Sequence, residues 1–225
     1  MSMGKTRESQ YQNTLEIRDS IGIQRLGLMT NQVYYDDPRR LVFLLARYKF
    51  VAKMLSGSRR VAELGCGDAF GSRIVLQEVE SLDAYDFDPI FVDDIQSRHV
   101  PRWPTPAVVH DILDAPLIYR YDAVYSLDVM EHIAPEKEDL FLNNLKASLL
   151  PNGVLIIGMP SLESQPYASE VSKRGHVNCQ SGKNLKSRLE REFHNVFLFS
   201  MNDEVVHTGF SQMAHYLLVV CTGDK

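Results

Sequence analysis

The sequence contains little of what marks a disulfide-linked, membrane-spanning or nucleic-acid-binding protein. Its 225 residues include only three cysteines, too few and too scattered for a disulfide framework or a zinc finger. No apolar run approaches the length of a membrane span, and the first residues lack the apolar stretch of a signal peptide. The net charge is −5, which does not favour the basic face that phosphate binding needs. We therefore expect a cytoplasmic protein with reduced thiols that acts on a small molecule rather than on nucleic acid.

The order of apolar and polar segments predicts an α/β fold. Short apolar runs alternate with amphipathic stretches, which is typical of βαβ units and a largely parallel sheet. Strands are expected over residues 61–64, 82–85, 107–110, 121–126, 154–159, 196–200 and 215–221, and a long polar loop over 160–180. The last two strands are joined by a link too short for a usual crossover, so they should pair as an antiparallel hairpin. We expect one domain over 1–225, with a helical cap over 1–57 and a seven-stranded core over 58–225.

A glycine turn after the first strand is the feature around which the core is organised. Gly65 and Gly67 allow the backbone to turn sharply and to approach a ligand closely. Gly71 comes one residue too late for a dinucleotide-binding fingerprint. Asp86 and Asp111 end the second and third strands, where carboxylates can meet ribose hydroxyls and an adenine amino group. All of these positions fall at the carboxyl ends of parallel strands, the edge at which such sheets bind ligands.

Five stretches together resemble the class I S-adenosylmethionine-dependent methyltransferases over roughly residues 40–222. They are residues 61–67, Asp86, Asp111-Ile112, 121–133 and 149–157. The resemblance implies a Rossmann-like, mostly parallel sheet with an antiparallel last strand and helices on both faces. It also implies that 58–225 binds the cofactor S-adenosyl-L-methionine.

The resemblance assigns roles to individual residues of the cofactor site. Glu63 and the amides around Gly65 and Gly67 would hold the methionine part, Asp86 would bind the ribose diol, and Asp111 with the amide of Ile112 would read the adenine. The expected cofactor-binding set is Glu63, Gly65, Cys66, Gly67, Asp86, Phe87, Asp111, Ile112 and Leu127. Ala69 stands where the family often has a third glycine, so we expect an adjusted loop geometry there.

The residues that follow the fourth strand are candidates for the methyl-transfer chemistry. Asp128, Glu131 and His132 have the spacing i, i+3, i+4 and would share a face if the segment is helical. His176 follows the fifth strand and so belongs to the same edge of the sheet. One interpretation makes His132 a general base oriented by Glu131 or Asp128.

A second interpretation makes Asp128, Glu131, His132 and His176 the ligands of a divalent metal, with Mg²⁺, Mn²⁺, Fe²⁺ and Zn²⁺ equally compatible. The spacing of a carboxylate, two residues and Glu-His is similar to that of small-RNA 2′-O-methyltransferases and of ubiquinone-biosynthesis O-methyltransferases. The same segment in the wider family mainly caps a helix and shapes the cofactor pocket, so this alternative stays open. Catalytic roles are expected for His132, Glu131 and His176.

These patterns lead to one functional hypothesis and two main alternatives. We expect methyl transfer from S-adenosyl-L-methionine to a hydroxyl oxygen of a small polar molecule, such as a sugar or activated sugar. The polar segments 160–180 and 201–213 would form the acceptor pocket. The alternatives are a metal-dependent RNA 2′-O-methyltransferase and a cofactor-binding protein without catalysis. A nicotinamide oxidoreductase is a more distant fourth hypothesis.

Overall fold

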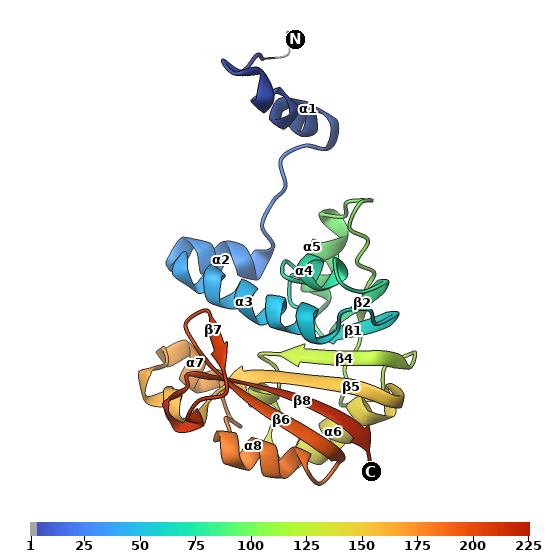
Figure 1. Ribbon diagram of the computed structural model, residues 1–225, viewed down its shortest axis with the longest axis vertical. Coiled ribbons are helices and arrows are strands. Elements are labelled where there is room, and N and C mark those ends of the chain that lie inside the picture. Colours follow the sequence, from blue (N-terminus) through green and yellow to red (C-terminus); the bar gives the residue numbers. More distant parts are fainter. Residues whose placement is uncertain (1–3) are drawn as a thin grey trace.

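The computed structural model describes residues 4–225 and contains a twisted sheet flanked by helices on both faces (Figure 1). The strand order is β3-β2-β1-β4-β5-β8-β6-β7. The strands are β1 (Arg60–Leu64), β2 (Ser81–Asp86), β3 (Ala107–Val109), β4 (Tyr121–Leu127), β5 (Leu149–Pro160), β6 (Phe193–Asn202), β7 (Val205–His207) and β8 (Tyr216–Asp224). β1 to β5 pair in parallel, whereas β8 runs antiparallel to both β5 and β6. The mostly parallel sheet with an antiparallel last strand is confirmed.

The expected strand count was one too low, because the link between the last two predicted strands contains β7. This short strand pairs antiparallel with the end of β6, from Asn202↔Val205 to Ser200↔His207. The sheet therefore has eight strands over the described residues instead of seven. A three-residue edge strand carries too little alternation to be read as a strand from sequence.

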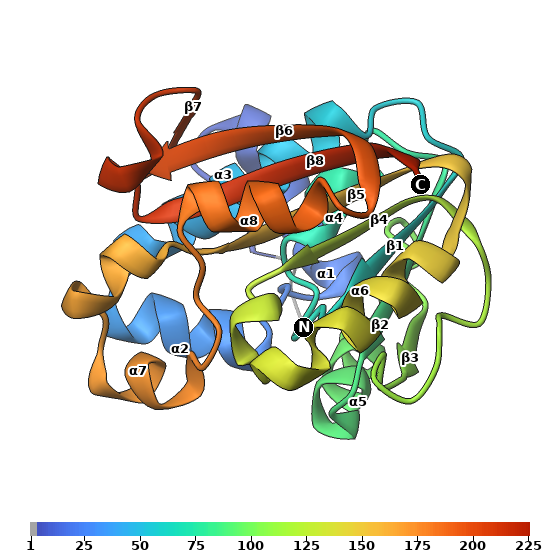
Figure 2. The same ribbon diagram turned by 90° about the horizontal axis from the view of Figure 1, so that it is seen from below.

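The helices lie on both sides of the sheet (Figures 1 and 2). They are α1 (Gln12–Ile21), α2 (Leu28–Asp36), α3 (Arg39–Met54), α4 (Ser72–Leu76), α5 (Pro89–Ser97), α6 (Glu138–Ala147), α7 (Glu170–Gly175) and α8 (Gly182–Leu189). α3, α4 and α5 pack on one face, and α6 and α8 pack on the other. Side chains along β1 alternate accordingly, since Ala62 and Leu64 face α6 and α8 while Val61 faces α3.

α2 lies within the helical cap expected over 1–57 and packs on α3. The segment 160–180, expected as a loop, instead contains a 3-10 helix (Leu162–Tyr167) and α7. Ser161 and Ser169 begin these two helices by accepting hydrogen bonds from the backbone N–H groups of Ser164 and Ser172. Both helices fall in the part of the chain that carries His176.

The N-terminal helix α1 lies apart from the sheet and has no buried residue (Figure 1). It runs from Gln12 to Ile21, within the helical cap expected over 1–57. Between residues 4 and 225, every helix is too short or too polar to cross a membrane.

Candidate active site

A cavity of about 490 Å³ opens where the carboxyl ends of β1, β2, β3 and β4 meet. This volume lies in the range of small-molecule sites. The cavity is lined by Met29, Leu64, Gly65, Gly67, Asp86, Phe87, Phe91, His110, Asp111, Ile112, Leu113, Asp128, Val129, His132 and Ile133. Six of the nine predicted cofactor residues are among them, namely Gly65, Gly67, Asp86, Phe87, Asp111 and Ile112.

The glycine turn forms the floor of this cavity. Gly65 has φ +71° and Gly67 has φ +51°, which are left-handed conformations that favour glycine. A Cβ at Gly65 would lie 2.2 Å from Cγ2 of Val129, so a side chain there would also clash. Ala69 takes φ +50°, the glycine-like conformation, which shows how the loop accommodates an alanine where the family often has glycine.

Asp86 links the turn to the end of β2. Its Oδ2 accepts the backbone N–H of Gly67 at 2.8 Å, and its Oδ1 accepts the N–H of Asp88 at 3.0 Å. Burial raises the pKa of Asp86, while these two hydrogen bonds favour the ionised form. Each carboxylate oxygen keeps a second lone pair for a hydroxyl group. The arrangement fits a group that carries a vicinal diol.

Three predicted cofactor residues lie behind the cavity wall instead of lining it. Glu63 is 1% exposed and accepts hydrogen bonds from the hydroxyls of Tyr48 (2.7 Å), Tyr125 (2.8 Å) and Ser72. Because side chains alternate along a strand, Glu63 points with Val61 toward α3 and away from the cavity. Cys66 and Leu127 are also buried and outside the lining. Burial raises the pKa of Glu63 to about 7, against the three donors.

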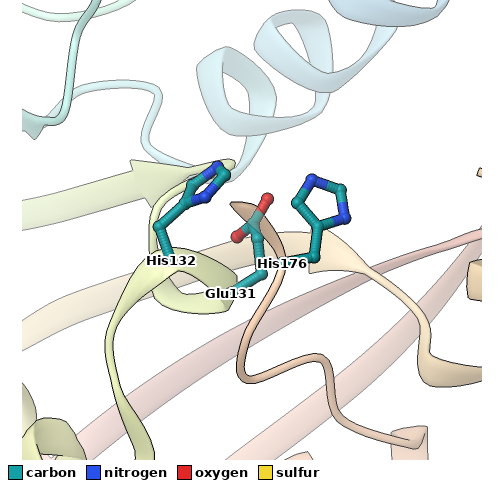
Figure 3. A group of neighbouring side chains, drawn as sticks. All are labelled: Glu131, His132 and His176. Carbon is teal, nitrogen blue, oxygen red and sulfur yellow. The ribbon is translucent and has the colours of Figure 1, made fainter. Parts of the chain in front are cut away.

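Glu131, His132 and His176 lie together at the rim of the cavity (Figure 3). One ligand atom of each residue lies within 4.8 Å of the other two, and the Glu131 carboxylate points up between the imidazole rings. The backbone carbonyl of Glu131 accepts the N–H groups of Val177 (2.8 Å) and Asn178 (3.0 Å). These two hydrogen bonds tie the segment after α7 to the segment after β4, and so place His176 beside His132.

The Nδ1 atom of each imidazole ring is within hydrogen-bond distance of an oxygen. Nδ1 of His132 lies 2.9 Å from the carbonyl of Gly175, and Nδ1 of His176 lies 2.9 Å from Oε1 of Gln165. Because each of these oxygens only accepts, Nδ1 carries a proton, and in the neutral ring Nε2 then has the lone pair. The general-base interpretation expected Glu131 or Asp128 to orient His132, whereas the structure assigns that contact to a backbone carbonyl.

The Glu131 carboxylate is electrostatically unsatisfied. Its Oε2 is buried without a hydrogen-bond partner in residues 4–225, and Glu131 itself is 1% exposed. Burial and the nearby Asp128 carboxylate raise the pKa of Glu131 well above its ordinary range. A buried oxygen with no donor and two imidazoles with free Nε2 atoms suit a divalent cation. The residues present therefore fit a metal.

Asp128, the fourth predicted ligand, does not join this group. It precedes the 3-10 helix (Met130–His132) and has φ +57°, so the three residues do not form the continuous helical face that the spacing suggested. Its Oδ2 pairs with Nη1 of Arg47 at 2.7 Å. Asp128 lines the cofactor cavity instead.

Several residues of the site were not identified from the sequence. Arg47 contacts the site from α3, Gln165 from the 3-10 helix before α7, and Met29 and Phe91 from α2 and α5. Met29 closes over the turn, since a Cβ at Gly67 would lie 2.6 Å from its Sδ. Gln165 belongs to the polar segment 160–180 that was expected to form the acceptor pocket, whereas no sequence signal marked the other three residues.

The sheet order, the glycine turn and the carboxylates at the ends of β2 and β3 define a class I methyltransferase fold. In agreement with this, residues 62–155 match the family model described as "Methyltransferase domain". This match and the shared fold agree with the resemblance to S-adenosylmethionine-dependent methyltransferases and support S-adenosyl-L-methionine as the cofactor. The comparison with curated proteins gives no match.

Solved structures of methyltransferases share the fold at low sequence identity. The N-methyltransferase NodS from Bradyrhizobium japonicum WM9, in complex with S-adenosyl-L-homocysteine, is 16% identical with a TM-score of 0.59, over 82% of this chain and 86% of that chain. The methyltransferase domain of bacterial CtHen1-C is 16% identical with a TM-score of 0.67, over 81% and 100%. A SAM-dependent methyltransferase from Archaeoglobus fulgidus is 16% identical with a TM-score of 0.65, over 86% and 98%.

Proposed function

We propose that this protein transfers the methyl group of S-adenosyl-L-methionine to a hydroxyl oxygen of a small polar acceptor, with a divalent cation held by Glu131, His132 and His176. The observation that carries the proposal is the unpartnered, buried carboxylate oxygen of Glu131 between two imidazoles at the rim of the cofactor cavity. A bound cation would lower the pKa of an acceptor hydroxyl, which is otherwise a poor nucleophile.

The roles of the chain's own residues follow from their places. Gly65, Gly67, Asp86 and Asp111 hold the cofactor from the floor and far wall of the cavity, and His132 lines it on the side where β4 ends. The acceptor oxygen would therefore lie beside the group formed by Glu131, His132 and His176, on the side of the cofactor cavity. In the reaction the acceptor oxygen forms a bond to the methyl carbon as the bond from that carbon to the cofactor sulfur breaks; the hydroxyl proton passes to solvent, and S-adenosylhomocysteine is released.

A polar acceptor is supported by the segment that brings His176 to the site. Hydroxyl and amide side chains recur along it at Ser161, Ser164, Gln165 and Ser172, and Gln165 contacts His176 directly. Ser161 is fully buried and bonded to the carbonyl of Ala214, so Ser164, Gln165 and Ser172 are the members placed to contact a hydroxylated molecule. A sugar or activated sugar remains the acceptor class that we propose.

Two further acceptor classes are carried by specific observations. NodS is an N-methyltransferase with the same fold, so an amine is the second acceptor class to test. The carboxylate, two residues and Glu-His spacing resembles that of small-RNA 2′-O-methyltransferases, and three of the four residues do lie together. The net charge of −5 counts against RNA.

One experiment distinguishes these acceptors. The protein is incubated with methyl-labelled S-adenosylmethionine and neutral sugars, the matching amino sugars, or short RNA, and products are identified by mass spectrometry. We expect the sugar to be methylated on oxygen. Exhaustive chelation should abolish formation of this product, and addition of Mg²⁺, Mn²⁺, Fe²⁺ or Zn²⁺ should restore it. Methylation of amine nitrogens alone would contradict the hydroxyl acceptor, and undiminished activity after chelation would contradict the metal.

Variants test the cluster independently of added ions. Glu131→Gln and His176→Gln should each lower activity at least tenfold, because each removes one of three ligands, while S-adenosylmethionine binding stays close to wild type. His194→Gln, at an exposed histidine on β6, is the matched control. Full activity of both cluster variants would show that the group is structural.

A further inference from the structure

Arg47 and Asp128 form an ion pair between α3 and the end of β4. Nη1 of Arg47 lies 2.7 Å from Oδ2 of Asp128, and the two side chains are 18% and 36% exposed. The residues are far apart in sequence, so the pair exists only because α3 packs against this end of the sheet. The pair lies beside Glu131, and the Asp128 carboxylate raises the pKa of Glu131 while the Arg47 guanidinium lowers it.

Asp128 has an unusual backbone conformation. Its φ is +57°, and its N–H donates to the carbonyl of Gly158 on β5 at 2.9 Å. This left-handed conformation is unfavourable for a residue other than glycine, so surrounding contacts, among them the ion pair with Arg47, must hold it. It breaks the helical continuation that would have put Asp128 on the same face as Glu131 and His132.

Arg47 is fully committed to this position. Its guanidinium lies 3.7 Å from the centroid of the Tyr216 ring, a cation–π distance, and its Nε is buried without a partner in residues 4–225. Desolvation opposes the charged form of Arg47, but Asp128, Tyr216 and Glu131 together more than compensate and raise its pKa. The guanidinium is thus held between Asp128 and Tyr216.

We infer that Arg47 is a positioning residue that withholds Asp128 from the Glu131–His132–His176 cluster. The inference rests on the metal site of the proposed function. With Asp128 engaged, the cluster offers two imidazoles and one carboxylate. An ion that prefers six ligands then keeps positions open for water or for acceptor oxygens. A second carboxylate would fill one of these positions and reduce the positive charge available to polarise a hydroxyl.

The test uses Co²⁺ as the metal probe and the full chain without a histidine tag. Co²⁺ affinity is measured by calorimetric titration, and the coordination is followed by the visible spectrum of the bound ion. Arg47→Met keeps an unbranched apolar stem against Tyr216 but frees Asp128, so Co²⁺ should bind about tenfold more tightly, with a changed spectrum. Asp128→Asn added to Arg47→Met should restore the wild-type affinity and spectrum. Arg40→Met, at an exposed arginine of the same helix, is the matched control.

A second variant covers the case in which Arg47→Met does not fold. Asp128→Asn alone should leave the Co²⁺ affinity within about twofold of wild type, because Asp128 is not a ligand while Arg47 holds it. A tenfold loss would make Asp128 a ligand and overturn the inference. An Arg47→Met variant that folds with unchanged Co²⁺ affinity and spectrum would also overturn it. If the wild type binds no Co²⁺, the metal site itself fails, which is a different result from a wild type that binds while Arg47→Met has no effect.

Discussion

The buried carboxyl of Glu63 predicts a specific pH dependence of stability. It is enclosed by the hydroxyls of Tyr48, Tyr125 and Ser72. Burial raises its pKa from an ordinary value of 4.5 to about 7, even though all three hydroxyls favour the charged form.

The sign follows from proton binding. Between pH 4.5 and 7 the native carboxyl keeps its proton while the unfolded one loses it, so the native state binds more protons. The free energy of unfolding must therefore fall as the pH rises through this window. The pKa difference corresponds to about 3 kcal/mol. Because Glu63 is fully buried, solvent screening does not reduce this figure appreciably.

Glu63→Gln isolates the effect, because every other titrating group cancels in the difference between the two proteins. We measure urea unfolding from pH 4.5 to 8 by the fluorescence of the single tryptophan, Trp103. The wild type should lose about 3 kcal/mol relative to Glu63→Gln across this range. Tyr125→Phe removes one hydrogen-bond donor to the charged carboxylate, which raises the pKa of Glu63 further. The loss of unfolding free energy should therefore extend to higher pH in this variant. Glu80→Gln, at an exposed glutamate, should give a difference that does not vary with pH. A flat difference for Glu63→Gln as well would refute the reasoning.

Two other substitutions test the cofactor cavity. Asp86→Asn should weaken S-adenosylmethionine binding about tenfold, as measured by calorimetry. The amide has one acceptor oxygen instead of two, so it cannot accept both the N–H of Gly67 and the ribose hydroxyls equally well. An unchanged affinity would show that Asp86 does not bind the ribose. Gly65→Ala should lower the free energy of unfolding by more than Gly57→Ala, since both have positive φ but only Gly65 would place a Cβ against Val129. Equal losses, of about 1 kcal/mol each, would mean that the loop yields to the clash.

The parallel half of the fold was predictable because its signals are local. Mostly apolar runs at residues 61–64, 121–126 and 154–159 are typical of strands covered on both faces, and all three are strands here. The glycines and acidic residues that follow such strands must meet at one edge, so much of the cavity lining could be predicted. β7 was missed because it is stabilised by pairing with β6 and not by a pattern of its own.

Glu63 shows where a resemblance can assign a role that the geometry does not support. The sequence places an acidic residue next to the glycine turn, but strand alternation turns its side chain toward α3. Tyr48 donates one of the hydrogen bonds that stabilise the buried carboxylate. It lies on α3, which is separated from β1 by a loop. No spacing rule links a tyrosine in that helix to a glutamate in β1, so the partnership required the tertiary structure.

Asp128 illustrates the same limit at the catalytic end. The spacing of Asp128, Glu131 and His132 predicts one helical face, and a metal site with two carboxylates follows from it. A single left-handed residue removes Asp128 from that face, and Arg47 provides a partner for the displaced carboxylate. The partner of Asp128 is therefore an arginine 81 positions away along the chain. Of the two carboxylates that the sequence suggested for the site, only Glu131 stays beside the imidazoles, and it keeps a buried oxygen without a donor in residues 4–225. This asymmetry between the two carboxylates is the feature on which the proposed metal site rests.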